Sequence, residues 1–174
     1  MSFINKIILF FATKLPKSII KLFAMRYVAG ESALNAIKTA KRLNDKGFSV
    51  TLDILGEHVK TQKEAIAITD EYVELFKLLY QFKIDGNISI KPSHIGLDIS
   101  VLEFEKNLSR IVKSAADTGN FLRIDMESSL STDQTIISTL KYQKLYNKIG
   151  TVIQAYLFRT IHDIDKLNEN DLLN

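Results

Sequence analysis

The chain has 174 residues, of which 46% are hydrophobic and 25% are charged. This balance excludes an intrinsically disordered chain and suits one compact domain or part of a larger one. The net charge of +3 is too small to indicate a nucleic-acid partner, and we expect none. The absence of cysteine excludes a disulfide framework, a thiolate zinc site and a cysteine nucleophile, and it fits a reducing compartment.

Residues 1–25 form a basic, apolar segment that we expect to be helical and separate from a domain over 26–174. No acidic residue precedes Gly30, while basic residues lie among large apolar ones at Lys6, Lys14, Lys17, Lys21 and Arg26. The longest uncharged run is Ile7–Thr13, and a membrane-spanning helix needs ~20 apolar residues. Two interpretations stay open. The segment is a helix pair, broken at Pro16, that packs on the domain, or an amphipathic segment on an anionic membrane surface.

Helical and strand patterns alternate from residue 31 onward. Thr61 and Glu64 have the spacing of a capping box, and Ser100 and Glu103 repeat it at the next helix. Helices are expected over 31–46, 61–82, 100–117, 131–147 and from residue 160, and strands are expected within 44–55, 83–93, 116–127 and 147–156.

Each strand segment carries a glycine near its start, followed by a short β-branched or aromatic run. These glycines are Gly47, Gly86, Gly119 and Gly150. Glycine suits the end of a helix, where the chain turns through positive φ, so each is expected to end the preceding helix. The pattern indicates a repeated helix–strand unit.

Alternation of helices and strands predicts an α/β fold with parallel strands and right-handed crossovers. The strands are short and nearly all apolar, so we expect both faces of the sheet to be covered. The candidates are an open doubly wound sheet and a (β/α)₈ TIM barrel. No G-x-G-x-x-G follows the first strand, which removes the main support for a dinucleotide-binding open sheet.

Polar residues stand at the carboxyl end of all four expected strands, where an apolar run would otherwise continue. In a β/α barrel these ends meet around one mouth, where the site is built. Lys91 is placed to neutralise Asp125, Glu127 or Asp53, and perturbed pKa values are expected there. The polar strand-end residues are Asp53, Glu57, Lys91, Asp125, Glu127, Gln154 and Tyr156.

Any one of these residues alone could be a helix cap or a strand-end ion pair, and for Glu57 that interpretation is as good as a functional one. Four coincident strand ends favour a site. His58, His94 and His162 are scattered without metal-ligand spacing. We therefore expect no metal site and place each histidine at the surface or in a loop.

Five motifs in this order resemble bacterial proline dehydrogenase, the flavin-dependent (β/α)₈ enzyme. The resemblance runs from Arg26 to Leu167. It implies FAD as cofactor and the oxidation of L-proline to Δ1-pyrroline-5-carboxylate, in the catabolism of proline to glutamate, with electrons passed to a membrane quinone. The motifs are "RYVAGES" (26–32), "TLDILGE" (51–57), "ISIKPS" (88–93), "GNFLRIDMES" (119–128) and "VIQAYLFRT" (152–160).

The resemblance also implies roles for single residues. Lys91 is similar to the lysine that meets the proline carboxylate, and Asp125 to the catalytic aspartate. Met126 is expected to lie against the flavin, and Gln154 to hydrogen-bond its isoalloxazine ring. Supporting positions within the family motifs are Asp53, Glu127 and Tyr156.

The chain departs from the family pattern at its end, Asn174, because a complete barrel needs ~250 residues. The later family motifs, an Arg-Leu-Val-Lys-Gly-Ala-Tyr strand and a late helix with paired arginines, are absent. We therefore expect about the first four βα units of the barrel, preceded by N-terminal helices. Such a chain would expose two sheet edges and an apolar barrel interior. It is expected to be inactive alone and to dimerise, aggregate or need a separate C-terminal half.

Two alternatives belong to other functional classes. One is an aldolase-like barrel with Lys91 as Schiff-base lysine and Asp125 as its proton carrier. The other is a non-enzymatic barrel remnant that binds a partner or membrane surface through residues 1–25. The expected location is the cytoplasm, peripheral at the inner face of the membrane.

Overall fold

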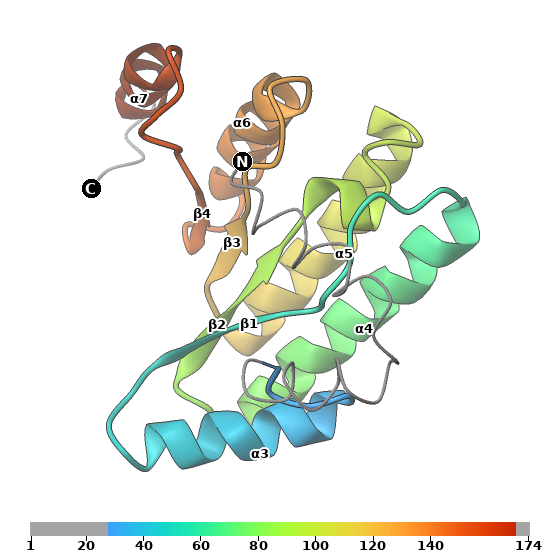
Figure 1. Ribbon diagram of the computed structural model, residues 1–174, viewed down its shortest axis with the longest axis vertical. Helices are drawn as coiled ribbons and strands as arrows, with labels where there is room; N and C mark the ends of the chain where they lie inside the picture. Colours follow the sequence, from blue (N-terminus) through green and yellow to red (C-terminus); the bar gives the residue numbers. More distant parts are fainter. Residues whose placement is uncertain (1–27, 170–174) are drawn as a thin grey trace, which may run out of the picture.

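The computed structural model describes residues 28–169, so the predictions for the basic segment 1–25 lie outside the described residues. Helices and strands alternate along the described range, as the sequence pattern predicts (Figure 1). No helix in this range has an apolar stretch long enough to cross a membrane. The elements are α3 (Ala33–Asn44), β1 (Val50–Asp53), α4 (Gln62–Gln81), β2 (Gly86–Ile90), the 3₁₀ turn η1 (Pro92–Ile95), α5 (Val101–Thr118), β3 (Leu122–Ile124), α6 (Thr132–Gln143), β4 (Ile149–Thr151) and α7 (Thr160–Asn168).

The strands form one parallel sheet in the order β1-β2-β3-β4, so each strand pairs with the next one along the chain. A doubly wound sheet reverses its strand order at a switch point, and this sheet has no such reversal. The prediction of an α/β fold with a parallel sheet is confirmed.

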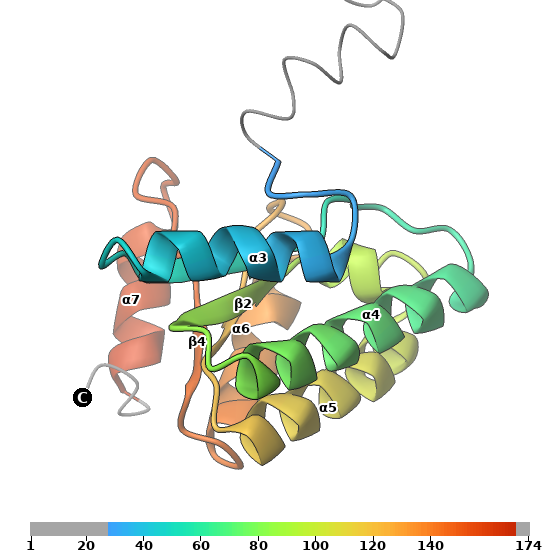
Figure 2. The same cartoon turned by 90° about the horizontal axis from the view of Figure 1, so that it is seen from below.

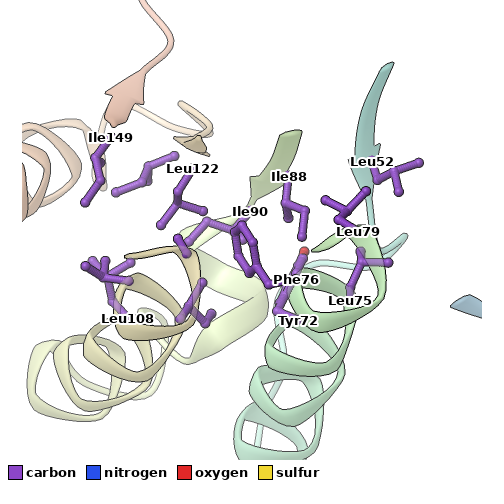
Figure 3. Packing of buried hydrophobic residues seen from close by; sticks show 14 of the residues in the cluster. Leu52, Tyr72, Leu75, Phe76, Leu79, Ile88, Ile90, Leu108, Leu122 and Ile149 are labelled. Atoms are coloured by element: carbon purple, nitrogen blue, oxygen red, sulfur yellow. The ribbon is translucent and has the colours of Figure 1, made fainter. Parts of the chain in front are cut away.

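One face of the sheet packs on α4 and α5, which lie side by side (Figures 1 and 2). Alternate strand residues point to this face, because successive side chains of a strand point to opposite sides. They meet Phe76 and Leu79 of α4 and Leu108 of α5, all at most 1% exposed (Figure 3). The strand residues in this core are Leu52, Ile88, Ile90, Leu122, Ile124 and Ile149.

The opposite face of the sheet is polar, so the prediction of an apolar interior and of nearly all-apolar strands is wrong. Asp53, Ser89 and Arg123 are neighbours in one row across β1, β2 and β3. Thr51 and Asn87 form the next row. The cause is visible in the strand sequences, where apolar and polar residues alternate with the period of two that sends them to opposite faces.

The predicted helix starts are confirmed at α4 and α5, the helices that follow β1 and β2. Thr61 Oγ1 accepts from the backbone N of Glu64 at 3.2 Å, and Glu64 Oε2 accepts from the backbone N of Thr61 at 3.0 Å. Ser100 Oγ accepts from the backbone N of Glu103 at 3.1 Å. These caps satisfy N–H groups that the first turn of a helix leaves without partners.

Glycines turn through positive φ at two of the four predicted positions. Gly47 (φ 84°) follows α3, and Gly119 (φ 69°) is the C-cap of α5. The prediction is wrong for Gly86 and Gly150, which lie inside β2 and β4. A neighbouring side chain occupies the space of a Cβ there, because that atom would lie 2.7 Å from Val50 Cγ2 and 2.8 Å from Phe121 Cζ, respectively.

Candidate active site

A cavity of about 670 Å³ opens where the strands end at their carboxyl side. Segments that follow all four strands contribute to it, with Arg123 from within β3. Of the predicted site residues, Lys91, Asp125, Met126, Glu127 and Glu57 line this space, whereas Asp53, Gln154 and Tyr156 do not. The remaining lining residues are His58, Arg123, Ser128 and Val152.

Lys91 follows β2 directly and forms an ion pair with Asp53 at the end of β1. Both side chains are about one-quarter exposed, at 24% and 26%. Tyr72 of α4 supports the carboxylate from the core, with its Oη 3.4 Å from Asp53 Oδ1. Burial of the phenol, together with the Asp53 charge, raises the pKa of Tyr72. Of the three carboxylates predicted to neutralise Lys91, Asp53 is therefore its partner.

A second ion pair lies beside the first. Arg123 Nε donates to Asp125 Oδ1 at 2.8 Å, and both residues line the cavity. Ser89 of β2, 1% exposed, lies between Asp53 of β1 and Arg123 of β3 in the same row of the sheet. Sequence reasoning missed Arg123, although it stands two residues before Asp125, which directly follows β3, and therefore points to the same face.

Residues 36–171 match the family model described as proline dehydrogenase. The chain belongs to the proline dehydrogenase family. Proline dehydrogenase 1 of Bacillus subtilis subsp. natto is 36% identical over 149 residues, 86% of this chain and 49% of that protein. Proline dehydrogenase of Deinococcus radiodurans is 30% identical over 155 residues, with 84% of this chain and 49% of that protein covered. The chain thus spans about half the length of the curated relatives it matches.

A solved structure has a similar fold over most of this chain. It is proline utilization A (PutA) from Bdellovibrio bacteriovorus inactivated by N-propargylglycine, with a TM-score of 0.74 and 23% identity over 82% of this chain and 18% of that one.

The family match gives no support to the aldolase-like alternative. Among residues 28–169, no three His, Asp or Glu side chains are grouped to hold a metal ion.

In this proline dehydrogenase family member, Glu127 has neutral hydrogen-bond donors as partners. Its Oε2 accepts from the backbone N of Ser93 at 2.7 Å and its Oε1 from Ser93 Oγ at 2.5 Å. Ser93 lies in η1, two residues after Lys91. Sequence reasoning missed Ser93, because nothing in the pattern shows that the turn after β2 contacts the end of β3.

The remaining predicted residues lie on the β3 and β4 ends. Met126 is 8% exposed and packs in a small cluster with Ile136 and Leu167. Gln154 Nε2 donates to the backbone O of Met126 at 3.2 Å, which fixes the direction of the amide. Tyr156 is 81% exposed and is not brought to the cavity.

The histidine predictions are partly wrong. His162 is exposed and His58 lies in an exposed loop, as expected, yet His58 also lines the cavity. His94 is only 4% exposed and packs edge-on against Tyr72, with the ring centroids 6.2 Å apart. Burial lowers the pKa of His94. It is covered by Gly56 (φ 145°), where an added Cβ would lie 2.5 Å from His94 Nε2.

His58 is expected to titrate above 6.5, the ordinary histidine value, because its Nδ1 lies 2.6 Å from Asp98 Oδ2 and this bond raises its pKa. The bond contributes fully below pH 6.5 and is lost as the pH rises through the raised pKa. NMR titration should place the His58 midpoint lower in Asp98→Asn. Asp117→Asn, which removes an exposed partner of Lys113, should leave it unchanged. A midpoint insensitive to Asp98→Asn would contradict the assignment.

Proposed function

We propose that this chain supplies the first four βα units of a (β/α)₈ proline dehydrogenase barrel. The enzyme oxidises L-proline to Δ1-pyrroline-5-carboxylate and passes the electrons to a quinone. One observation carries the proposal. In a chain that matches this family, Lys91, Arg123, Asp125 and Met126 line one cavity at the strand ends of a parallel sheet.

The residues of the cavity fit FAD as the cofactor. Apolar Met126 and Val152 lie next to the cations of Lys91 and Arg123, a lining that suits a flat aromatic ring with polar edges. A cavity of about 670 Å³ is within the usual range of ~300–1,000 Å³ for such sites. When bound, FAD supplies the two-electron acceptor for the oxidation of proline. Met126 would pack against it. Gln154 does not line the cavity, so its hydrogen bond to the ring rests on the family resemblance alone.

The two ion pairs suit a zwitterionic substrate. We assign the Lys91 ammonium to the proline carboxylate and Asp53 to the orientation of Lys91, with which it pairs. Asp125 uses Oδ1 to pair with Arg123, and we assign Oδ2 to the proline amine. Fixed charges of both signs orient the substrate in the cavity, and such pre-organisation lowers the barrier without further rearrangement.

The proposed location is the cytoplasm, at the inner face of the membrane, where a quinone acceptor would be reached. Support comes from the composition of residues 1–25, in which lysines lie among large apolar residues and no acid is present. Such a segment binds anionic lipid surfaces through both its charge and its apolar area.

A complementation experiment tests the proposal. The purified chain would be mixed with FAD, alone and together with the C-terminal half of Bacillus subtilis proline dehydrogenase 1. Proline-dependent loss of the flavin absorbance is expected for the mixture and not for the chain alone. A mixture that binds no flavin, or binds flavin without reduction by proline, would contradict the proposal.

A further inference from the structure

Ser93 connects the ends of three neighbouring strands. It is 3% exposed and lies in η1, the turn that begins directly after Lys91 at the end of β2. From the β3 side, both carboxylate oxygens of Glu127 accept hydrogen bonds from it, one from the backbone N at 2.7 Å and one from Oγ at 2.5 Å. This two-point contact fixes the turn relative to β3.

The segment after β1 binds the same serine from the other side. The backbone N of His58 donates to Ser93 Oγ at 3.0 Å, and the backbone N of Val59 donates to the Ser93 carbonyl at 3.3 Å. An ionised carboxylate only accepts, so the Ser93 hydroxyl proton points to Glu127 and its lone pair receives His58 N. Glu127 thereby sets the direction of both hydrogen bonds at the Ser93 hydroxyl, and we call the chain from Glu127 through Ser93 to His58 the relay.

Glu127 differs from Asp53 and Asp125 in the kind of partner it has. Asp53 pairs with Lys91, and Asp125 pairs with Arg123. The hydrogen bonds of Glu127 come from the amide and hydroxyl of one neutral residue. Hydrogen bonds to an ionised acceptor are roughly twice as strong as neutral ones, so this contact is suited to hold a backbone turn in place.

We propose that Glu127 is a positioning residue for the proline oxidation proposed above. It acts through Ser93 to hold both the turn that carries Lys91 and the loop that carries Glu57 and His58. The three pieces that meet at Ser93 come from three separate strands, so no contact within one segment could fix their relative positions. Glu127 does not touch the reacting atoms in this role.

The first test measures position without requiring flavin or proline. In Glu127→Ala, amide hydrogen exchange at His58 and Val59 is expected to rise about tenfold, since bonds to charged groups are among the stronger ones. Acetylation of Lys91, followed by mass spectrometry, should also become faster. Glu105→Ala is the matched control, because the Glu105 carboxylate, 17% exposed, likewise accepts from a serine hydroxyl, Ser138 Oγ at 2.5 Å, but lies between α5 and α6; it should leave exchange at His58 and Val59 unchanged.

A second variant separates the steps of the relay and applies even if Glu127→Ala does not fold. Ser93→Ala removes the hydroxyl that accepts from His58 but keeps the carbonyl that accepts from Val59. Exchange at His58 should therefore rise, and exchange at Val59 should change much less. Equal rises at both amides, or none at either, would overturn the proposed relay.

A kinetic measurement in the complemented enzyme connects position to function. Glu127→Ala is expected to raise KM for proline by about tenfold with a smaller change in kcat, because the Lys91 turn is displaced while the reacting groups are retained. Glu127→Gln, which keeps one acceptor oxygen, should recover part of the loss. Two results for Glu127→Ala would overturn the positioning role. One is faster amide exchange throughout the core of α4 and α5, and the other is an unchanged KM for proline although exchange at His58 and Val59 has risen. The exchange result is independent of whether the chain oxidises proline.

Discussion

Replacement of Lys91 by methionine is expected to lower kcat/KM for proline about 100-fold in the complemented enzyme. A hydrogen bond to a charged group contributes about 1.5–3 kcal/mol, and about 1.4 kcal/mol corresponds to a tenfold change. The variant also leaves Asp53, which pairs with Lys91 beside the cavity, without its cation, and this negative charge would repel the carboxylate of an incoming substrate. The loss should therefore fall at the upper end of that range.

Flavin reduction by proline under single-turnover conditions is the direct measurement for this variant. Lys148→Met serves as the control, because Lys148 directly precedes β4 at the opposite end of the sheet, where its Nζ donates to the Gly119 carbonyl at 3.0 Å. Lys91→Arg should recover part of the activity, since it keeps the charge but not the compact geometry of an ammonium. Wild-type kcat/KM in Lys91→Met would remove the assignment of this lysine to the substrate.

Local sequence signals correctly predicted the alternating order of helices and strands. The spacing of Thr61 and Glu64 gives the start of α4, because a capping box depends only on residues within one turn. Lys91 and Asp125 were predicted to close short runs of strand length, and they directly follow β2 and β3. Both kinds of signal act within a few residues, so they can be read before the tertiary arrangement is known.

The partners of the charged residues could not be predicted in the same way. The β2–β3 register, continued by one residue, places Lys91 next to Asp125. Asp125 nevertheless forms its ion pair with Arg123. Lys91 pairs instead with Asp53 of the neighbouring strand β1. The choice of partners depends on competition between two cations for neighbouring carboxylates.

The burial of His94 and Ser93 was not predicted, for a related reason. Their burial comes from the loop after β1 folding over η1, a contact between segments 35 residues apart.

Replacement of Phe76 by alanine is expected to have the largest effect on stability, lowering the free energy of unfolding by about 3–5 kcal/mol. Phe76 is 0% exposed and lies at the centre of the core between α4, α5 and β2 (Figure 3). The substitution loses the stabilisation that comes from burying the aromatic ring. It also leaves a cavity that the packed helices can fill only in part. Urea unfolding of the chain, followed by far-UV circular dichroism, gives the difference directly.

Tyr80→Ala is the matched control for this variant, because Tyr80 lies one turn further along α4 and is 68% exposed. Its substitution should change the unfolding free energy by no more than about 0.5 kcal/mol. Similar losses for the two variants would mean that α4 does not pack on the sheet through Phe76. The consequence extends to the site, since Tyr72, one turn before Phe76, contacts Asp53. A loosened α4 should therefore weaken the support of the Lys91–Asp53 pair as well as the core.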